Sequence, residues 1–199
     1  LIGMPVTILP QKMAGSINSF PIVAAPLFIL MGNILGKAQI TDRIVHFASA
    51  LIGWIRGGYA HASILTSMIF AGMVGSAVAD AAGSGAIEIR AMRKAGYRPE
   101  TAASITAAAA TIGPIIPPSL PMVIYGVTAD VSVGKLFMGG LLPGLLMGVS
   151  LMLMVAFVAR REGMGRIAFP GFRVLAKTFV DCFFAIMTPV VILGGMFSG

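Results

Sequence analysis

Three prolines interrupt the longest uncharged stretch of this sequence. The heptapeptide GPIIPPS, Gly113 to Ser119, lies near the middle of 29 consecutive uncharged residues, Thr101 to Ala129. A proline inside a helix removes a backbone donor and clashes with the preceding turn, so three within five residues leave backbone groups without partners. Such a break is tolerated at membrane depth only where protein covers it or where it lines a polar cavity. If this stretch crosses a membrane, the heptapeptide is a candidate site.

Composition and uncharged runs predict a membrane protein. Hydrophobic residues make up 57% of the 199 residues and charged residues 11%, whereas a soluble domain has roughly 25% charged residues. Four uncharged runs each exceed the ~20 residues that span the hydrocarbon core. These runs are Met13 to Gly36, Gly57 to Ala79, Thr101 to Ala129 and Leu136 to Ala159. We therefore expect an all-α polytopic membrane protein.

The sequence argues against a nucleic-acid-binding protein and against an enzyme. The net charge is +7, but the basic residues form short clusters between apolar runs, with no aromatic-basic stripe. The single cysteine, Cys182, allows neither an internal disulfide nor a cysteine-based metal site. The sequence has no phosphate-binding loop of the type G-x-x-x-x-G-K-S/T, no GxSG turn, and only Asp80 as an aspartate inside an apolar run. We expect no enzymatic activity, no cofactor and no nucleic-acid partner.

The first half of the chain is predicted to contain a span, an interfacial helix and a re-entrant hairpin. Residues 13–36 form the span, and residues 41–57 carry apolar residues at the spacing of a helix lying on the membrane surface. Residues 59–89 are too many for one crossing and too few for two, and their glycine-rich centre fits a hairpin that enters and leaves by the same face. This hairpin also places all basic clusters on one side, as the positive-inside rule requires, whereas a single crossing divides them.

The second half is predicted to contain three further elements. Residues 101–129 form a span that is broken at GPIIPPS, and residues 136–159 form an uninterrupted span. Residues 172–199 are expected to form an interfacial helix followed by the start of another span. Interrupted helices within inverted repeats are a common design of secondary transporters.

Two interrupted elements are the candidate sites. One is GSAVADAAGSG, Gly75 to Gly85, at the hairpin tip, and the other is GPIIPPS. Both expose backbone carbonyls, hydroxyls and half-helix ends. Sodium and other hard cations prefer such oxygens, whereas an anionic substrate favours half-helix N-termini. The alternatives are that GPIIPPS only kinks a helix and that the glycines and serines only pack helices together.

Asp80 is the acidic residue within the apolar part of the hairpin. An ionisable group at membrane depth indicates a functional site by default, so Asp80 is interpreted as a cation ligand or as a group that holds the tip. The other interpretation is that it caps the second half-helix by accepting hydrogen bonds from nearby amides. The sequence leaves both open.

Five segments resemble the large membrane subunit of the tripartite ATP-independent periplasmic (TRAP) transporters. They are FPIVAAPLFILMGNIL, FAGMVGSAVADAAGSG, MRKAGYRPE, GPIIPPSLPMVIYG and TPVVILGGMFSG, in unbroken order along almost the whole chain. The resemblance implies two inverted repeats, each with a re-entrant hairpin and a discontinuous helix, in an elevator-type transporter. We expect this chain to be a fragment that holds the first repeat.

The resemblance also implies a function. The family imports small organic anions, such as C4-dicarboxylates, sialic acid or related carboxylates, across the bacterial inner membrane with sodium as the coupling ion. Its implied partners are a small membrane subunit and a periplasmic substrate-binding protein, with membrane lipid around it. By motif match, sodium lies between the hairpin tip and the broken helix. The residues so implied are Gly75, Ser76, Asp80, Ser84, Gly113, Pro117, Pro118 and Ser119.

Two other functions are compatible with the same physical reading. A stand-alone sodium-coupled carboxylate transporter shares the hairpin and the broken helix but works without a binding protein. A non-transporting membrane scaffold explains packing glycines but not a polar break in mid-membrane. No sequence feature identifies the substrate.

Overall fold

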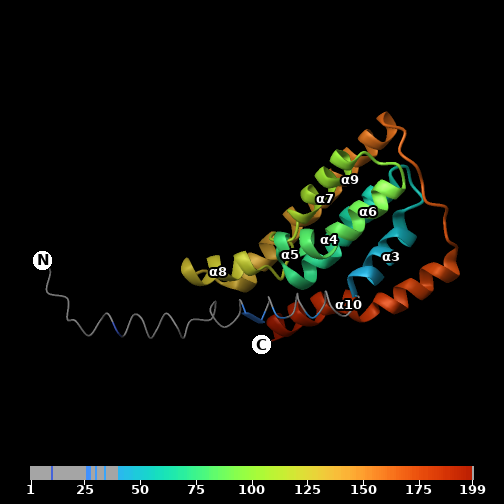
Figure 1. Ribbon diagram of the computed structural model, residues 1–199. Helices are drawn as coiled ribbons and strands as arrows, with labels where there is room; N and C mark the ends of the chain where they lie inside the picture. The colour runs from blue at the N-terminus through green and yellow to red at the C-terminus, as the bar shows by residue number, and fades with distance from the viewer. Residues whose placement is uncertain (1–9, 11–25, 28–29, 31–33, 35–39, 199) are drawn as a thin grey trace, which may run out of the picture.

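The protein is all-helical over the residues that the computed structural model describes, which are 10, 26, 27, 30, 34 and 40–198. This confirms that the protein is all-α, as predicted (Figure 1). In chain order the helices are α3 (Ile40–Ile52), α4 (Gly58–Val74), α5 (Ala77–Gly83), α6 (Gly85–Lys94), α7 (Pro99–Ala110), α8 (Leu120–Thr128), α9 (Val133–Arg161) and α10 (Phe172–Ser198). The span expected at residues 13–36 lies outside the described residues, apart from four isolated positions.

Two helices of the described chain are long and apolar enough to cross a membrane. They are α9, with a mean hydropathy of 2.4, and the Phe172–Val191 part of α10, with a mean hydropathy of 1.7. Both leave large apolar side chains exposed, among them Leu142, Leu153, Phe157, Phe184 and Val190. Contiguous exposed apolar surface of this kind is typical of a lipid-facing or protein-binding helix rather than of a water-facing one.

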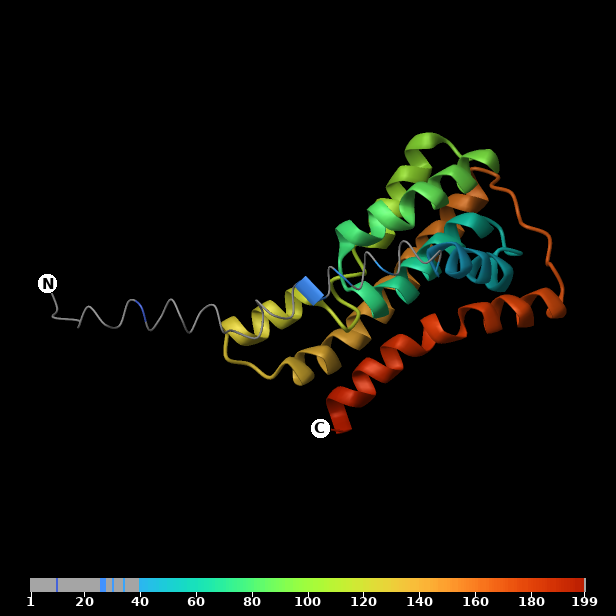
Figure 2. The same cartoon turned by 60° about the horizontal axis from the view of Figure 1, so that its bottom comes forward.

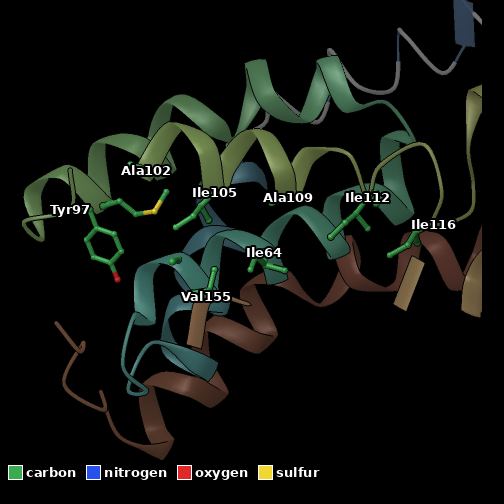
Figure 3. Packing of buried hydrophobic residues seen from close by; sticks show 11 residues of the cluster. Ile64, Tyr97, Ala102, Ile105, Ala109, Ile112, Ile116 and Val155 are labelled. Carbon is green, nitrogen blue, oxygen red and sulfur yellow. The ribbon is translucent and has the colours of Figure 1, made fainter. Parts of the chain in front are cut away.

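Helix α4 is the centre of the bundle. It contacts α3, α5, α6, α7, α9 and α10, and most of its residues are buried, as expected of a helix that is covered all round. Figure 3 shows one of its sides, where Ile64 joins a buried cluster with Ile105 and Ala109 of α7 and Val155 of α9. On another side, Phe70 packs in a second cluster with residues of α3 and α10.

Helix α4 forms an antiparallel hairpin with α5 and α6. The Ser63 hydroxyl, near the start of α4, donates a hydrogen bond to the Glu88 carboxylate in α6, and Phe70 lies opposite Gly83. The chain therefore reverses between α4 and α5. At 1.5 Å per residue, the 17 residues of α4 rise about 25 Å, which is less than the ~30 Å hydrocarbon core.

The observed hairpin differs in detail from the predicted one. Its apex is formed by Gly75 and Ser76 alone, because residues Ala77–Gly83 already form α5. The rest of the segment predicted to form the tip, residues 77–85, therefore belongs to the return arm, which is the part of the hairpin that follows the apex. That arm continues through α6 to Lys94, where Glu88 and Met92 are buried on one face and the basic residues Arg90, Arg93 and Lys94 are exposed.

The hairpin gathers basic residues at one end of the bundle. The Gly57 amide donates to the Gly165 carbonyl at 3.1 Å, and residues 95–98 share a cavity with residues 162–165. These contacts bring the α3–α4 connection, the α6–α7 turn and the end of α9 together (Figure 1). The basic residues in these segments are Arg56, Arg90, Arg93, Lys94, Arg98, Arg160, Arg161 and Arg166. Such clustering is what the positive-inside rule expects of one membrane face.

The predicted broken span consists of two helices separated by non-helical residues. Helix α7 ends at Ala110, residues 111–119 are not helical, and α8 begins at Leu120. Figure 2 shows α8 projecting from the bundle alongside the first part of α9. Val123 and Phe137 are buried between these two helices.

Helix α10 is one continuous helix, where the sequence analysis expected an interfacial helix followed by a separate span. Pro189 lies inside it, and the Cγ atom of Pro189 lies 2.7 Å from where a Cβ atom of Gly72 would be. A proline within a membrane helix is tolerated where a neighbouring helix covers the backbone it disturbs. The close packing of Pro189 on Gly72 of α4 thus explains why α10 continues through this proline as one helix.

Three glycines at four-residue spacing allow α9 to approach the bundle closely. A Cβ atom on Gly140 would lie 2.6 Å from the Ile115 carbonyl oxygen, and one on Gly144 would lie 2.4 Å from Cγ1 of Ile116. Gly148 is in similarly close contact with α4. Small residues at this spacing are a common basis of close helix packing in membranes.

Neighbouring glycines in α9 provide a matched pair of variants. We expect Gly140→Ala to destabilise the protein, because the new methyl group meets a backbone oxygen that cannot rotate away, an overpacking cost of about 1–3 kcal/mol. Gly139 has no atom within 4 Å of its Cβ position, so Gly139→Ala should be neutral or slightly stabilising. Thermal unfolding in detergent measures both, and equal melting temperatures would contradict this packing.

Candidate functional site

The hairpin apex is a two-residue reversal that the sequence supports locally. Gly75 ends α4 with φ 59° and ψ 27°, and its amide donates to the Ala71 carbonyl. Glycine adopts this left-handed conformation without the steric cost that a Cβ atom imposes. Ser76 is extended and caps α5, since its hydroxyl accepts from the Ala79 amide at 3.4 Å. Serine is among the preferred N-cap residues.

The break, which we define as the non-helical residues 111–119 between α7 and α8, ends at Ser119. Ser119 is fully buried and caps α8, because its Oγ atom accepts a hydrogen bond from the Met122 amide at 3.3 Å. The same hydroxyl donates to the Pro114 carbonyl at 2.6 Å. A serine oxygen has two lone pairs, so one acceptor position of Ser119 remains free.

The break also leaves backbone carbonyl groups without hydrogen-bond partners. Within the described part of the chain, the backbone oxygens of residues 115–118 accept no hydrogen bond. Prolines at 114, 117, 118 and 121 contribute no donors, and the Pro117–Pro118 peptide bond is cis. Backbone oxygens without partners are the feature that the proline-rich sequence predicts, and they are available as ligands.

The apex of the hairpin lies directly against the break. A Cβ atom on Gly75 would lie 2.1 Å from the Pro118 carbonyl oxygen and 2.7 Å from the Ser119 Cα atom. From the other side, a Cβ atom on Gly113 would lie 3.3 Å from both the Ser76 carbonyl carbon and the Ala77 amide nitrogen. The two interrupted elements, 38 residues apart along the chain between Gly75 and Gly113, therefore meet backbone to backbone.

A second group of polar side chains lies inside the hairpin. The Ser84 hydroxyl donates to Oδ1 of Asp80 at 2.8 Å, and Ser63 donates to Oε2 of Glu88. Glu88 and Asp80 lie close enough to interact electrostatically. Ser67 of α4 lies beside the Asp80 carboxylate, although its hydroxyl makes no hydrogen bond of good geometry. We call Ser63, Ser67, Asp80, Ser84 and Glu88 the polar ladder.

The structure thus divides the predicted site residues into two groups. Apex and break residues lie together: Gly75, Ser76, Gly113, Pro117, Pro118 and Ser119. Asp80 and Ser84 belong to the polar ladder, one to two turns along the return arm. The capping interpretation of Asp80 is wrong, because Ser76 is the N-cap of α5 and Asp80 lies in its first turn.

Sequence reasoning missed Glu88. It is only 3% exposed, yet it stands near the end of the apolar run, two residues before Arg90, where the sequence suggests the beginning of a charged surface segment. A signal was present in the four-residue spacing of Asp80, Ser84 and Glu88, which places them on one helical face. The serines that face them in α4 have the same spacing.

The arrangement at the apex and break suits a hard cation. It offers carbonyl and hydroxyl oxygens, the ligands that sodium prefers. Among the described residues, no three histidine, cysteine, aspartate or glutamate side chains are placed to hold a metal ion. Any cation at the apex would therefore be held mainly by backbone and hydroxyl oxygens.

Comparison with known proteins gives a family match over the whole chain. A family model described as "Tripartite ATP-independent periplasmic transporter, DctM component" matches residues 1–199. The sialic acid TRAP transporter large permease protein SiaM of Vibrio cholerae is 44% identical over 189 residues, which are 95% of this chain and 44% of that protein. The sialic acid TRAP transporter permease protein SiaT of Haemophilus influenzae is 45% identical over 189 residues, or 31% of its length.

A relative with a different printed substrate matches as well. The C4-dicarboxylate TRAP transporter large permease protein DctM of Vibrio cholerae is 38% identical over 180 residues, which are 90% of this chain and 40% of that protein. The chain therefore spans less than half the length of these curated relatives.

Proposed function

Because the chain belongs to the DctM-component family of the tripartite ATP-independent periplasmic transporters, we propose that it forms the first repeat of the large permease subunit of a sodium-coupled importer. The substrate is a small organic anion, a C4-dicarboxylate, sialic acid or a related carboxylate. The working transporter includes a small membrane subunit and a periplasmic substrate-binding protein, and it lies in the bacterial inner membrane. Family membership favours this function over the stand-alone carrier and the scaffold.

The contact between the hairpin apex and the break carries this proposal. Sodium coupling needs a site that exists in one conformation and is lost in another, so that ion binding shifts the balance between them. Here the site would be composed of two elements that belong to different parts of the chain, and separating them dismantles it. In this proposal the ligands come from the Ser119 hydroxyl, the unpaired carbonyls of the break, and the backbone at Gly75 and Ser76.

The polar ladder has a separate role in this proposal. Asp80 is joined to the apex through its amide, which donates to the Ser76 carbonyl at 3.0 Å. Its carboxylate contributes negative charge close to the cation, and its bond with Ser84 fixes the return arm. We therefore propose Asp80 and Ser84 as supporting residues rather than as the principal ligands.

Uptake into proteoliposomes tests the function. The vesicles hold the full-length large subunit with its small membrane partner, and radiolabelled sialic acid or succinate is supplied with and without a sodium gradient and with and without the binding protein. Uptake that needs both the gradient and the binding protein supports the proposal. Uptake without the binding protein would instead indicate the stand-alone carrier.

Ser119→Ala tests the cation site. We expect the sodium concentration for half-maximal uptake to rise about fivefold, because one hydroxyl ligand is lost, a change worth on the order of 1 kcal/mol. Ser132→Ala is the matched control, since Ser132 caps α9 by accepting from the Lys135 amide but lies away from the break. If both variants change the sodium dependence equally, the effect comes from loss of a helix cap rather than from the site.

A further inference from the structure

A groove opens at the basic end of the bundle. It has a volume of about 600 Å³ and lies between the α3–α4 connection, the C-terminal half of α9 and the loop that follows α9. Its apolar side is formed by α9, where Leu153 is 67% exposed and Val149 is also exposed. Three arginines also line the groove, Arg160 at the end of α9, Arg56 in the α3–α4 connection and Arg166 in the loop after α9.

The three arginines come from different segments, and backbone hydrogen bonds join the two segments that carry Arg56 and Arg166. Two backbone hydrogen bonds lie on either side of Arg166. The Gly165 carbonyl accepts from the Gly57 amide at 3.1 Å, and the Ile167 amide donates to the Gly53 carbonyl at 2.9 Å. These bonds fix the loop after α9 onto the connection that carries Arg56. The position of Arg166 in the groove is thus set by main-chain structure.

Among the described residues, no carboxylate neutralises the positive charge of the groove. No acidic side chain is among its lining residues. Over the described part of the chain, the one ion pair joins Arg98 to Glu100, outside the groove. Three guanidinium groups without carboxylate partners favour binding of an anion, and guanidinium matches the geometry of phosphate oxygens.

A buried histidine points to a missing partner at the same place. His61 lines the groove, is 3% exposed, and neither of its ring nitrogens has a hydrogen-bond partner in the described structure. A buried polar group without a partner typically costs about 1–3 kcal/mol. Because both nitrogens are themselves buried, a ligand in the groove removes that cost only if the imidazole turns toward it.

We propose that this groove binds an anionic phospholipid, with its phosphate held by Arg56, Arg160 and Arg166 and one acyl chain lying against α9. The exposed apolar surface of α9 decides between a lipid and a soluble anion. A soluble anion would occupy the arginines and leave Val149 and Leu153 uncovered, whereas a phospholipid satisfies both halves of the groove. Basic pockets between membrane helices are known to bind anionic head groups.

Trp54 supports the same occupant. Its ring is half exposed at the groove, and its Nε1 atom donates to the Leu51 carbonyl at 3.0 Å. Tryptophan is enriched at the depth of lipid head groups, where one part of the ring is apolar and another is polar. The indole therefore places the groove at the level where a phosphodiester and the first acyl carbons meet.

Native mass spectrometry of the full-length large subunit with its small membrane partner tests this inference. We expect phosphatidylglycerol to remain bound to the protein at a lipid concentration at which phosphatidylcholine does not. In a variant with Arg56→Gln, Arg160→Gln and Arg166→Gln, binding of phosphatidylglycerol should weaken at least tenfold, since each arginine near a lipid surface contributes roughly fivefold. The matched control carries Arg90→Gln, Arg93→Gln and Lys94→Gln in exposed positions of α6, and it should bind as the unchanged protein does.

A second measurement locates the acyl chain. Phosphatidylglycerol with a photoreactive acyl chain should label peptides that contain residues 149–156 of α9, and the triple groove variant should lose this label. Equal binding of phosphatidylglycerol to the groove variant and the control would overturn the proposal. Displacement of the lipid by millimolar inorganic phosphate or glycerol phosphate would overturn it as well, because it would show a soluble-anion site without an acyl contact.

Discussion

Gly75→Ala is expected to abolish sodium-driven uptake while the protein still inserts into the membrane. Two effects act together at this position. The left-handed conformation with φ 59° costs a residue with a Cβ atom about 1–2 kcal/mol. In addition, the new methyl group would lie 2.1 Å from the Pro118 carbonyl oxygen and 2.7 Å from the Ser119 Cα atom. Both are backbone atoms, so the apex and the break must move apart.

The separation is expected to affect function more than folding. Most of the buried cluster that holds α4 to α7 and α9 lies along these helices, although Ile112 and Ile116 between α7 and α8 also belong to it. The bundle therefore keeps most of its core. The proposed cation site, by contrast, exists only where the two elements meet. Sodium-dependent uptake should therefore fall to background, while expression and membrane insertion remain close to those of the unchanged protein.

Gly83→Ala provides the matched control for this prediction. Gly83 lies in the same hairpin, in helical conformation at the end of α5, and the nearest atom to its Cβ position is Cζ of Phe70 at 3.7 Å. That distance is an ordinary van der Waals contact, so the variant should transport normally. If uptake by the Gly75→Ala variant depends on sodium as uptake by the unchanged protein does, the cation site does not lie at the contact between the apex and the break.

The interruptions were predictable from the sequence, but their contact was not. Prolines at 114, 117 and 118 and the glycines near 75 act on the backbone locally, and their effect is independent of distant residues. The contact between Gly75 and Pro118 is made by backbone atoms of two segments far apart in sequence. It leaves no periodicity in either segment, and only the family resemblance indicated it.

The boundaries of the hairpin and of α10 depended on tertiary packing. The apex was expected across the glycine-rich segment to Gly85, but glycine is a weak helix breaker where neighbours cover the helix, and Gly83 and Gly85 both lie within helices. Pro189 similarly remains inside α10 because its ring lies against Gly72. In both cases the competing contact comes from another element and is absent from the local sequence.

Glu88 shows a different limit of sequence reasoning. A glutamate at the boundary between an apolar run and a basic cluster is usually exposed, because burial of a carboxylate is costly unless it is paired or hydrogen-bonded. Here the partner is Ser63 in the opposite arm. The pairing becomes apparent only once the arms are aligned about Gly75 and Ser76, which depends on knowing where the chain reverses.

The polar ladder leads to the second large prediction, which concerns stability. We expect Glu88→Ala to lower the free energy of unfolding of the full-length subunit by about 2–4 kcal/mol. The change leaves the buried Ser63 hydroxyl without its acceptor and opens a cavity between α4 and α6. Chemical or thermal unfolding in detergent micelles measures it. Glu100→Ala is the control, because Glu100 is exposed and makes only a surface ion pair with Arg98 at 3.7 Å, a kind of pair worth little.

Glu88→Gln separates the shape of this side chain from its charge. Asp80 lies close enough to Glu88 to interact with it electrostatically, so removal of the Glu88 charge relieves any repulsion between the two carboxylates. Glutamine keeps the length of the side chain and an oxygen that accepts from Ser63. We therefore expect Glu88→Gln to be at least as stable as the unchanged protein. If Glu88→Gln were instead as unstable as Glu88→Ala, the charge of Glu88 would be what the hairpin requires, and a cation next to Asp80 and Glu88 would have to balance it.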